Sequence, residues 1–168
     1  MMDIRKALAQ DAAGIRAVCA AGNRSTYPGL LPQHEIERVI EKFYNEQRIL
    51  GEIHNIRQDW NGWFVAVENG EVIGAGGGGF TDKTVAEVYV LYLDPERKYQ
   101  GIGTKLLEAI TQDQIARGAE MQWVAVLKGN GMAIPFYEAR GFVFQSEEAA
   151  YDMPEGESQR SLRYKRSI

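Results

Sequence analysis

The chain has 168 residues, of which 45% are hydrophobic and 25% charged, and these values fit one globular domain, residues 1–168, better than two. Its formal net charge is −4 and it has no block of Lys and Arg or long apolar segment, so we expect a cytoplasmic protein with no nucleic-acid and no membrane partner. Cys19 is the only cysteine, and His34 and His54 lack companions at ligand spacing, so we expect neither a disulfide nor a metal site.

The first third of the chain predicts one short strand and two or more helices. Residues 3–7 begin a strand, and residues 11–19 carry apolar side chains at helical spacing. Residues 23–32 are rich in turn-forming types. Residues 36–53 have the apolar repeat of an amphipathic helix, for which we expect a break near Gly51.

The rest of the chain alternates strands and helices. Asn69-Gly70 lies between two apolar runs and is typical of a hairpin turn. This order predicts a mixed α/β fold with a central sheet. The expected strands are 63–68, 72–80, 87–93, 122–127, 142–144 and 162–165, and the expected helices run from Gly103 to about Gly118 and from 131 to 140.

Four consecutive glycines, Gly76–Gly79, allow two interpretations. A glycine-rich loop can hold a phosphate group, but no helix begins after this one. We therefore favour a strand that contains a bulge or over which other backbone passes closely.

The turn from Lys98 to Gly103 predicts an anion site. Its glycines let backbone approach a ligand, and a helix start offers unpaired N–H groups and the positive end of the helix dipole. A dinucleotide fingerprint would need a third glycine at Leu106, and a P-loop would need Gly-Lys-Ser/Thr, so neither motif is present. A nucleotide-dependent enzyme is the disfavoured alternative.

Two motifs make the chain resemble the GNAT superfamily of N-acetyltransferases. The first is Arg/Gln-x-x-Gly-x-Gly/Ala after a proline turn; here Pro95 and Gly101-Ile102-Gly103 match, while Lys98 stands where Arg or Gln is usual. The resemblance extends over nearly the whole chain and implies the GNAT acyl-CoA N-acyltransferase fold, a mixed sheet of about six to seven strands flanked by about four helices. The second motif is Asn130-x-x-Ala133-x-x-Phe136-Tyr137-Glu138-x-x-Gly141-Phe142. Two further segments, Ile4-Arg5-x-Ala7-x-x-x-Asp11 and Tyr27-x-Gly29-x-x-Pro32, resemble the family's first strand and helix-linking loop.

The resemblance implies that acetyl-CoA (coenzyme A) is the co-substrate and that no metal is used. Family members splay two parallel strands apart, here those ending near Leu93 and Leu127, to admit the pantetheine arm. One backbone N–H of the first strand would polarise the thioester carbonyl. Asn130 would bond the pantetheine arm or cap the next helix. The expected coenzyme-binding residues are Leu91, Tyr92 and Leu93 for pantetheine, Lys98, Tyr99, Gln100, Gly101, Ile102, Gly103 and Thr104 for the pyrophosphate, and Asn130, Ala133 and Phe136.

Three side chains are candidates for catalysis. Tyr137 resembles the family's general acid, and a phenol can protonate a departing thiolate. The resemblance points to Glu87 as the base, directly or through water, and Tyr89 would project from the same sheet face as a relay. The alternatives are aromatic packing for Tyr137 and a plain strand-start residue for Glu87.

The acceptor is expected to be a primary amine of a small molecule or peptide. In the family the loop between the first two helices borders the acceptor groove, which places Tyr27, Leu30 and Leu31 there; ordinary packing is the alternative. We expect direct attack in a ternary complex and a possible homodimer. A non-catalytic acyl-CoA-binding module of the same fold is the alternative function.

Overall fold

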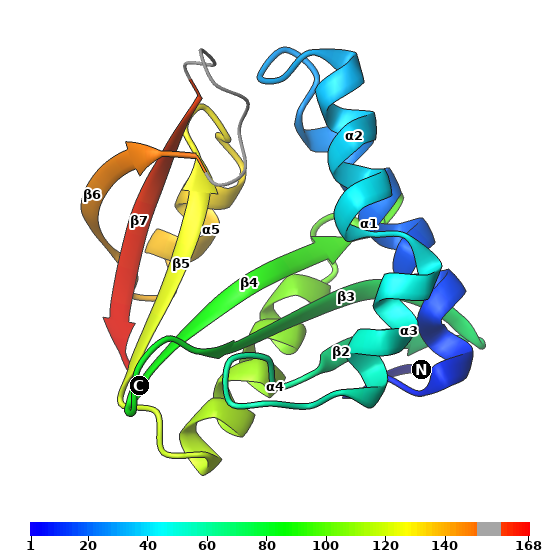
Figure 1. The fold of residues 1–168 in the computed structure, drawn as a ribbon, viewed down its shortest axis with the longest axis horizontal. Helices are drawn as coiled ribbons and strands as arrows, with labels where there is room; N and C mark the ends of the chain where they lie inside the picture. Colours follow the sequence, from blue (N-terminus) through cyan, green and yellow to red (C-terminus); the bar gives the residue numbers. More distant parts are fainter. Residues whose placement is uncertain (151–158) are drawn as a thin grey trace.

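The computed structural model describes residues 1–150 and 159–168, whose strands form one seven-stranded sheet in the order β1-β2-β3-β4-β5-β7-β6 (Figure 1). Neighbouring strands are antiparallel except β4 and β5, which are parallel. The predicted mixed α/β fold is therefore confirmed. The strands are β1 (Met2–Lys6), β2 (Trp63–Glu68), β3 (Glu71–Phe80), β4 (Val85–Leu93), β5 (Met121–Leu127), β6 (Val143–Ala149) and β7 (Arg160–Ser167); the helices are α1 (Ala12–Thr26), α2 (Gln33–Phe43), α3 (Glu46–His54), α4 (Ile102–Ala116) and α5 (Ala133–Glu138).

Helices cover the two faces of the sheet unequally. Alternate residues of a strand point to opposite faces: in β2, Val65 packs with α1 and α3, whereas Phe64 and Ala66 pack with α4. α5 lies on the α4 side, where Phe136 packs against the same cluster. Figure 1 shows that α1, α2 and α3 stand over the β2–β4 part of the sheet and leave the corresponding face of β5, β7 and β6 open.

The glycine run of β3 is a strand with a bulge, as favoured from the sequence. Gly77 pairs with Val90 but Gly78 pairs with Val88, so Tyr89 is an extra residue on β4. A Cβ at Gly78 would lie 2.0 Å from the Glu87 carbonyl oxygen, and one at Gly79 would lie 2.1 Å from the Asp59 carbonyl oxygen. Backbone passes so closely on both sides that only glycine fits.

Three helix boundaries differ from those expected. α1 continues to Thr26, through residues 23–26 that were expected to form a turn, and the Asn23 side chain donates to the Cys19 carbonyl within the helix. The break in the second helical region lies at Asn45 and not near Gly51, since the Asn45 side chain accepts from the Arg48 N–H and caps α3. α5 is shorter than the predicted 131–140.

β4 and β5 pair only along part of their length. The parallel register runs from Val85–Met121 to Val88–Val124 and ends there, although β4 continues to Leu93 and β5 to Leu127. In Figure 1 the two strands run together near the C-terminus and diverge toward their carboxyl ends. β7 pairs with β5 along all of it, so the free edges of β4 and β5 face one another across the opening.

Candidate active site

A cavity of about 400 Å³ occupies the opening between β4 and β5. A second hollow, of about 450 Å³, lies on the far side of α4 and contains none of the predicted catalytic residues. The predicted site residues that line the first cavity are Tyr27, Tyr89, Leu91, Tyr92, Leu93, Lys98, Gly103, Asn130, Ala133, Phe136 and Tyr137; those that do not are Glu87, Tyr99, Gln100, Gly101, Ile102, Thr104, Leu30 and Leu31.

The turn between β4 and α4 closes one end of this cavity. Gly101 has φ +78°, and Tyr99 has φ +65° while its side chain is 94% exposed. A positive φ is unfavourable for an aromatic residue, so this turn holds a strained backbone of the kind found at ligand sites. The Lys105 N–H donates to the Gly101 carbonyl at 3.1 Å, which begins the helix and leaves its first N–H groups without intrahelical acceptors.

The opposite wall is built by α5 and the loop before it. The Asn130 side chain accepts from the N–H groups of Met132 (3.3 Å) and Ala133 (3.2 Å), so it bonds the start of α5 from two residues before the N-cap, Met132. Lys98 crosses toward this wall, with its ammonium 3.7 Å from the Met132 sulfur. A Cβ on Gly103 would meet Phe136 at 3.3 Å and Leu93 at 3.4 Å, so a small residue here brings α4 close to α5.

Tyr137 stands in this wall between two other aromatic rings. It makes edge-to-face contacts with Phe136 (5.2 Å) and Phe142 (5.3 Å), and it is partly buried. Burial raises the pKa of the Tyr137 phenol above its usual range, and the nearby Tyr27 adds to the effect. The phenol therefore keeps its proton at neutral pH.

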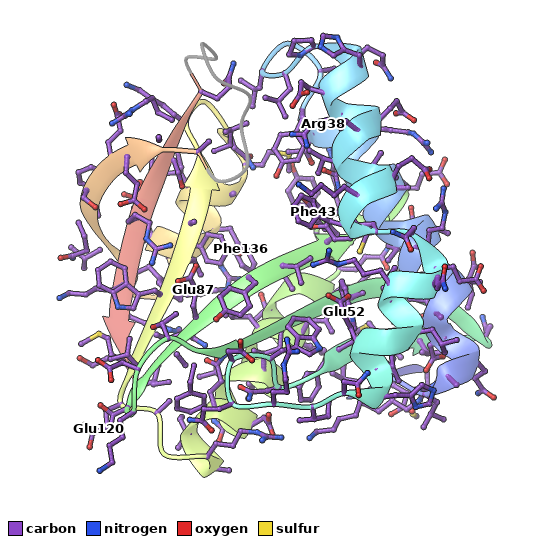
Figure 2. All side chains as sticks on the ribbon, in the orientation of Figure 1. Arg38, Phe43, Glu52, Glu87, Glu120 and Phe136 are labelled. Carbon is purple, nitrogen blue, oxygen red and sulfur yellow. The ribbon has the colours of Figure 1, made fainter. Side chains whose placement is uncertain are left out.

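Glu87 lies at the point where β4 and β5 part (Figure 2). Its two carboxylate oxygens accept from the Arg163 guanidinium on β7 at 2.8 and 3.0 Å, and Arg163 also lies 5.2 Å from the centroid of the Trp123 ring. Burial, and after it the charges of Glu87 and Asp59, raise the pKa of the Tyr89 phenol. Glu87 and Tyr89 are thus neighbours, and the carboxylate is held by an arginine that sequence reasoning did not pair with it.

The α1–α2 loop reaches the cavity through Tyr27. The Tyr27 and Tyr92 hydroxyls lie 3.1 Å apart, and the Tyr92 hydroxyl also reaches the Asn23 side chain at 3.4 Å. A Cβ on Gly129 would lie 2.7 Å from Leu30 Cδ2, so Leu30 contacts the loop between β5 and α5 without lining the cavity. Leu31 instead packs against the cluster formed by α1 and α2.

Sequence reasoning missed several residues of the cavity wall. Gly22, Ser25 and Thr26 come from the last turns of α1. The segment from Ala125 to Leu127 supplies the free edge of β5. Proximity to Tyr27 could have indicated Thr26, whereas nothing local in the sequence indicates that Arg163 lies beside Glu87.

A comparison with family models decides the classification. The model of the acetyltransferase (GNAT) family matches residues 25–142, which is most of the chain. The chain belongs to the GNAT acetyltransferase family. The turn at Gly101 and the α5 wall both lie within the matched residues. Among residues 1–150 and 159–168, no group of three or more His, Cys, Asp or Glu residues is placed to hold a metal ion.

Individual relatives agree with this classification. The chain is 35% identical over 57 residues to the ribosomal protein bS18-alanine N-acetyltransferase of Escherichia coli (strain K12), and the alignment covers 34% of this chain and 38% of that protein. The chain therefore spans well under half of that relative's length in the match. The same kind of protein in Shigella flexneri aligns over the same extent.

Solved structures show the same fold over the full length. The PaiA N-acetyltransferase of Thermoplasma acidophilum, solved in complex with coenzyme A, has a TM-score of 0.81 and 24% identity, covering 97% of this chain and 98% of that one. Ard1 of Thermoplasma volcanium has a TM-score of 0.75 and 19% identity, covering 99% and 97%. No helix in the described part of the chain is long and apolar enough to cross a membrane.

Proposed function

We propose that this GNAT family member transfers the acetyl group of acetyl-CoA to a primary amine, by direct attack in a ternary complex. The observation that carries the proposal is the separation of β4 from β5 beyond Val88–Val124. It leaves a cavity of about 400 Å³ between a glycine turn at a helix start and the phenol of Tyr137. The relative of known structure that was solved with coenzyme A has the same fold.

The residues around the cavity fit coenzyme A. The N–H groups of Lys98 to Thr104 would bind the pyrophosphate, helped by the positive end of the α4 dipole. The free backbone edge of Leu91–Leu93 would pair with the amides of the pantetheine arm, as a strand of a sheet would. Ala133 and Phe136 would form the apolar side of the channel, and Gly103 leaves room between them and β4.

Acetyl-CoA, when bound, supplies an acetyl thioester whose C–S bond breaks as the amine nitrogen bonds to the carbonyl carbon. A backbone N–H of β4 would donate to the carbonyl oxygen as its charge grows. Tyr137, which carries its phenolic proton at neutral pH, would donate that proton to the departing sulfur. Glu87, directly or through water and Tyr89, would take the proton that the amine loses.

Deprotonating the amine is the demanding part of this reaction. An alkyl ammonium with an ordinary pKa costs about 4.6 kcal/mol to deprotonate at pH 7. Arg163 uses one lone pair on each Glu87 oxygen and balances the carboxylate charge, so Glu87 would not bind the ammonium as an ion pair of its own. Its remaining lone pairs would accept the proton through a water molecule, next to Tyr89.

The acceptor would enter beside the α1–α2 loop. Tyr27 lines the cavity, so Tyr27 and the adjacent Leu30 would contact the amine-bearing group, and Leu31 would support them from the helix cluster. The curated relative is named for an alanine of a ribosomal protein, so both peptide and small-molecule amines are candidates. A single domain over residues 1–168, a homodimer and a cytoplasmic location remain predictions.

The first experiment measures acetyl-CoA-dependent thiol release against a panel of amines that includes an alanine-initiated peptide and polyamines. We expect one amine class to stimulate release, and Tyr137→Phe to lower kcat by about 10²-fold or more. Tyr164→Phe is the matched control, because Tyr164 is buried in the same cluster but lies outside the cavity. Release that stays near the wild-type rate in Tyr137→Phe would remove its role as the acid.

A second variant tests the base. Glu87→Gln retains the shape and one oxygen acceptor for Arg163 but cannot accept the proton. If Glu87 is the base, kcat at pH 7 falls by about 10²-fold or more and the acidic limb of the pH–rate profile changes. An unchanged profile would leave water alone as the acceptor. Coenzyme binding without turnover of any amine would favour the non-catalytic acyl-CoA-binding module.

A further inference from the structure

Three polar side chains, Gln114 of α4, Gln122 of β5 and Arg166 of β7, form a continuous hydrogen-bonded chain beneath the active site. Gln114 and Gln122 are 1% and 0% exposed, so water cannot satisfy their amides. Gln114 Nε2 donates to the Glu87 carbonyl at 3.1 Å, Gln122 Nε2 donates to Gln114 Oε1 at 2.9 Å, and Arg166 Nε donates to Gln122 Oε1 at 2.9 Å. We call these three residues the brace.

The brace ends on the Glu87 carbonyl, beside the bulge of β4. Glu87 precedes the last β4–β5 pair, Val88–Val124, and the extra residue of the bulge, Tyr89. Its carbonyl lies close to Gly78, where a Cβ would be 2.0 Å from the oxygen. Gln114 donates to this carbonyl from α4, outside the sheet, so the hydrogen bond connects the bulge to the helix.

Arg166 sets the direction of every hydrogen bond in the brace. A guanidinium only donates, so the Gln122 atom that faces Arg166 must be its oxygen. The Gln122 amide nitrogen then faces Gln114 Oε1, and the Gln114 nitrogen must face the Glu87 carbonyl. The polarity of the chain is therefore imposed from β7, which only β5 separates from β4 in the sheet.

Arg166 also reaches the other wall of the cavity. Its Nη1 donates to the Arg140 carbonyl at 2.8 Å. Arg140 in turn donates to the Phe136 carbonyl at 2.7 Å, bonds the Thr104 hydroxyl, and stacks 3.8 Å from the centroid of the Phe136 ring. Phe136 lines the cavity, so one arginine connects the β4 bulge, the start of α4 and the α5 wall.

We propose that Gln114, Gln122 and Arg166 are positioning residues for acetyl transfer, which hold the Glu87 carbonyl and so aim the free segment Tyr89–Leu93 at the bound coenzyme. This inference rests on the proposed function. The brace touches neither coenzyme nor amine; it acts through the backbone of β4 and through the α5 wall. Without its amide donor the Glu87 carbonyl moves toward another partner, and the N–H groups that follow it turn away from the cavity.

Gln114→Met tests the brace, because methionine keeps the length of the side chain and removes the donor. We expect the Kd for coenzyme A, measured by calorimetry, to rise about fivefold, and kcat to fall about tenfold. Ile49→Val is the control for lost stability alone, since Ile49 is fully buried in the other cluster and lies outside the cavity. All proteins are compared at a temperature at which they are folded.

Arg166→Met is the second variant, and it carries the test if Gln114→Met does not fold. It should change Kd and kcat in the same direction, and the double variant should show less than the product of the two single effects, because both break one chain. If both variants have the same Kd and kcat as Ile49→Val, the proposal that the brace positions β4 for acetyl transfer is wrong. Failure of the wild type to bind coenzyme A would instead overturn the proposed function.

Discussion

The two halves of β4 share one neighbour, β3, but only the first half has a neighbour on the other side. Ala86–Val88 pair with β3 and with β5, whereas Val90–Leu93 pair with β3 alone. One extra residue, Tyr89, and one carbonyl bonded from α4 separate the two halves. A strand pairing that ends early leaves backbone donors and acceptors available, so backbone groups can themselves form one edge of a binding site.

The largest effect is expected from removing the glycine that permits the bulge. In Gly78→Ala the new Cβ would lie 2.0 Å from the Glu87 oxygen and 2.8 Å from Gln114 Nε2, so the paired half of β4 must move. We expect the free energy of unfolding to fall by at least about 3 kcal/mol, measured by denaturant titration. Gly51→Ala is the control: its Cβ meets nothing within 4 Å, and it should stabilise α3 by about 0.5–1 kcal/mol. A small loss in Gly78→Ala would show that the bulge tolerates a side chain.

A second variant separates global stability from the site. Arg5 holds Asp11 at 2.7 Å, and the Leu8 N–H donates to the same carboxylate at 2.7 Å. Burial alone would raise the pKa of Asp11, but these hydrogen bonds outweigh burial and the pKa is lowered. Asp11→Asn should lower the free energy of unfolding at pH 7 by about 1–3 kcal/mol without changing coenzyme affinity.

The lowered pKa also predicts how this loss depends on pH. A carboxylate with a lowered pKa stabilises the fold above the pKa of the unfolded chain, about 4, and loses that contribution as the pH falls below it. The difference between wild type and Asp11→Asn should therefore shrink in denaturant titrations below pH 4. A difference that is the same at pH 3 and pH 7 would contradict the assignment.

Narrowing the cavity beside the unpaired half of β4 should weaken the affinity for coenzyme A and change the stability of the fold only slightly. Gly103→Ala gains helix propensity but places a Cβ 3.3 Å from Phe136 and 3.4 Å from Leu93, at the wall of the cavity. We expect the Kd for coenzyme A to rise about three- to tenfold, a change of roughly 1 kcal/mol, with the unfolding midpoint nearly unchanged. Calorimetry checks the first expectation and thermal unfolding the second. An unaltered Kd would mean that coenzyme A does not bind next to Gly103.

The smallest effect is expected at Leu30, in the loop that follows Tyr27. Leu30→Ala would open the contact with Gly129 and leave the coenzyme wall intact. We expect KM for the amine to rise by less than about threefold, and bulkier amines to become better substrates, since a hydrophobic contact of this size is worth about 1 kcal/mol or less when partly exposed. Steady-state kinetics against amines of increasing size tests this, with acetyl-CoA saturating. No change in amine preference would place the acceptor away from Leu30.

Much of the fold follows from local signals in the sequence. The Asn69-Gly70 turn takes positive φ at its two residues, and the alternation around it forms β2 and β3. The glycines at 76–79 and 101 indicate backbone geometry directly, because a close approach of neighbouring backbone or a positive φ disfavours residues with a Cβ. Asn45 carried an equally local signal, an N-cap, which places the helix break where the structure has it.

Local patterns in the sequence were enough to predict the order of strands and helices, the glycine turn at 101 and the family resemblance. Three contacts become visible only in the folded chain: Glu87 with Arg163, Leu30 with Gly129, and Arg166 with the bulge through two glutamines. Each of them joins residues that lie far apart along the chain. Helical periods and turns depend on neighbours a few residues apart, whereas these contacts depend on the register of β7 against β5 and on where β4 leaves β5.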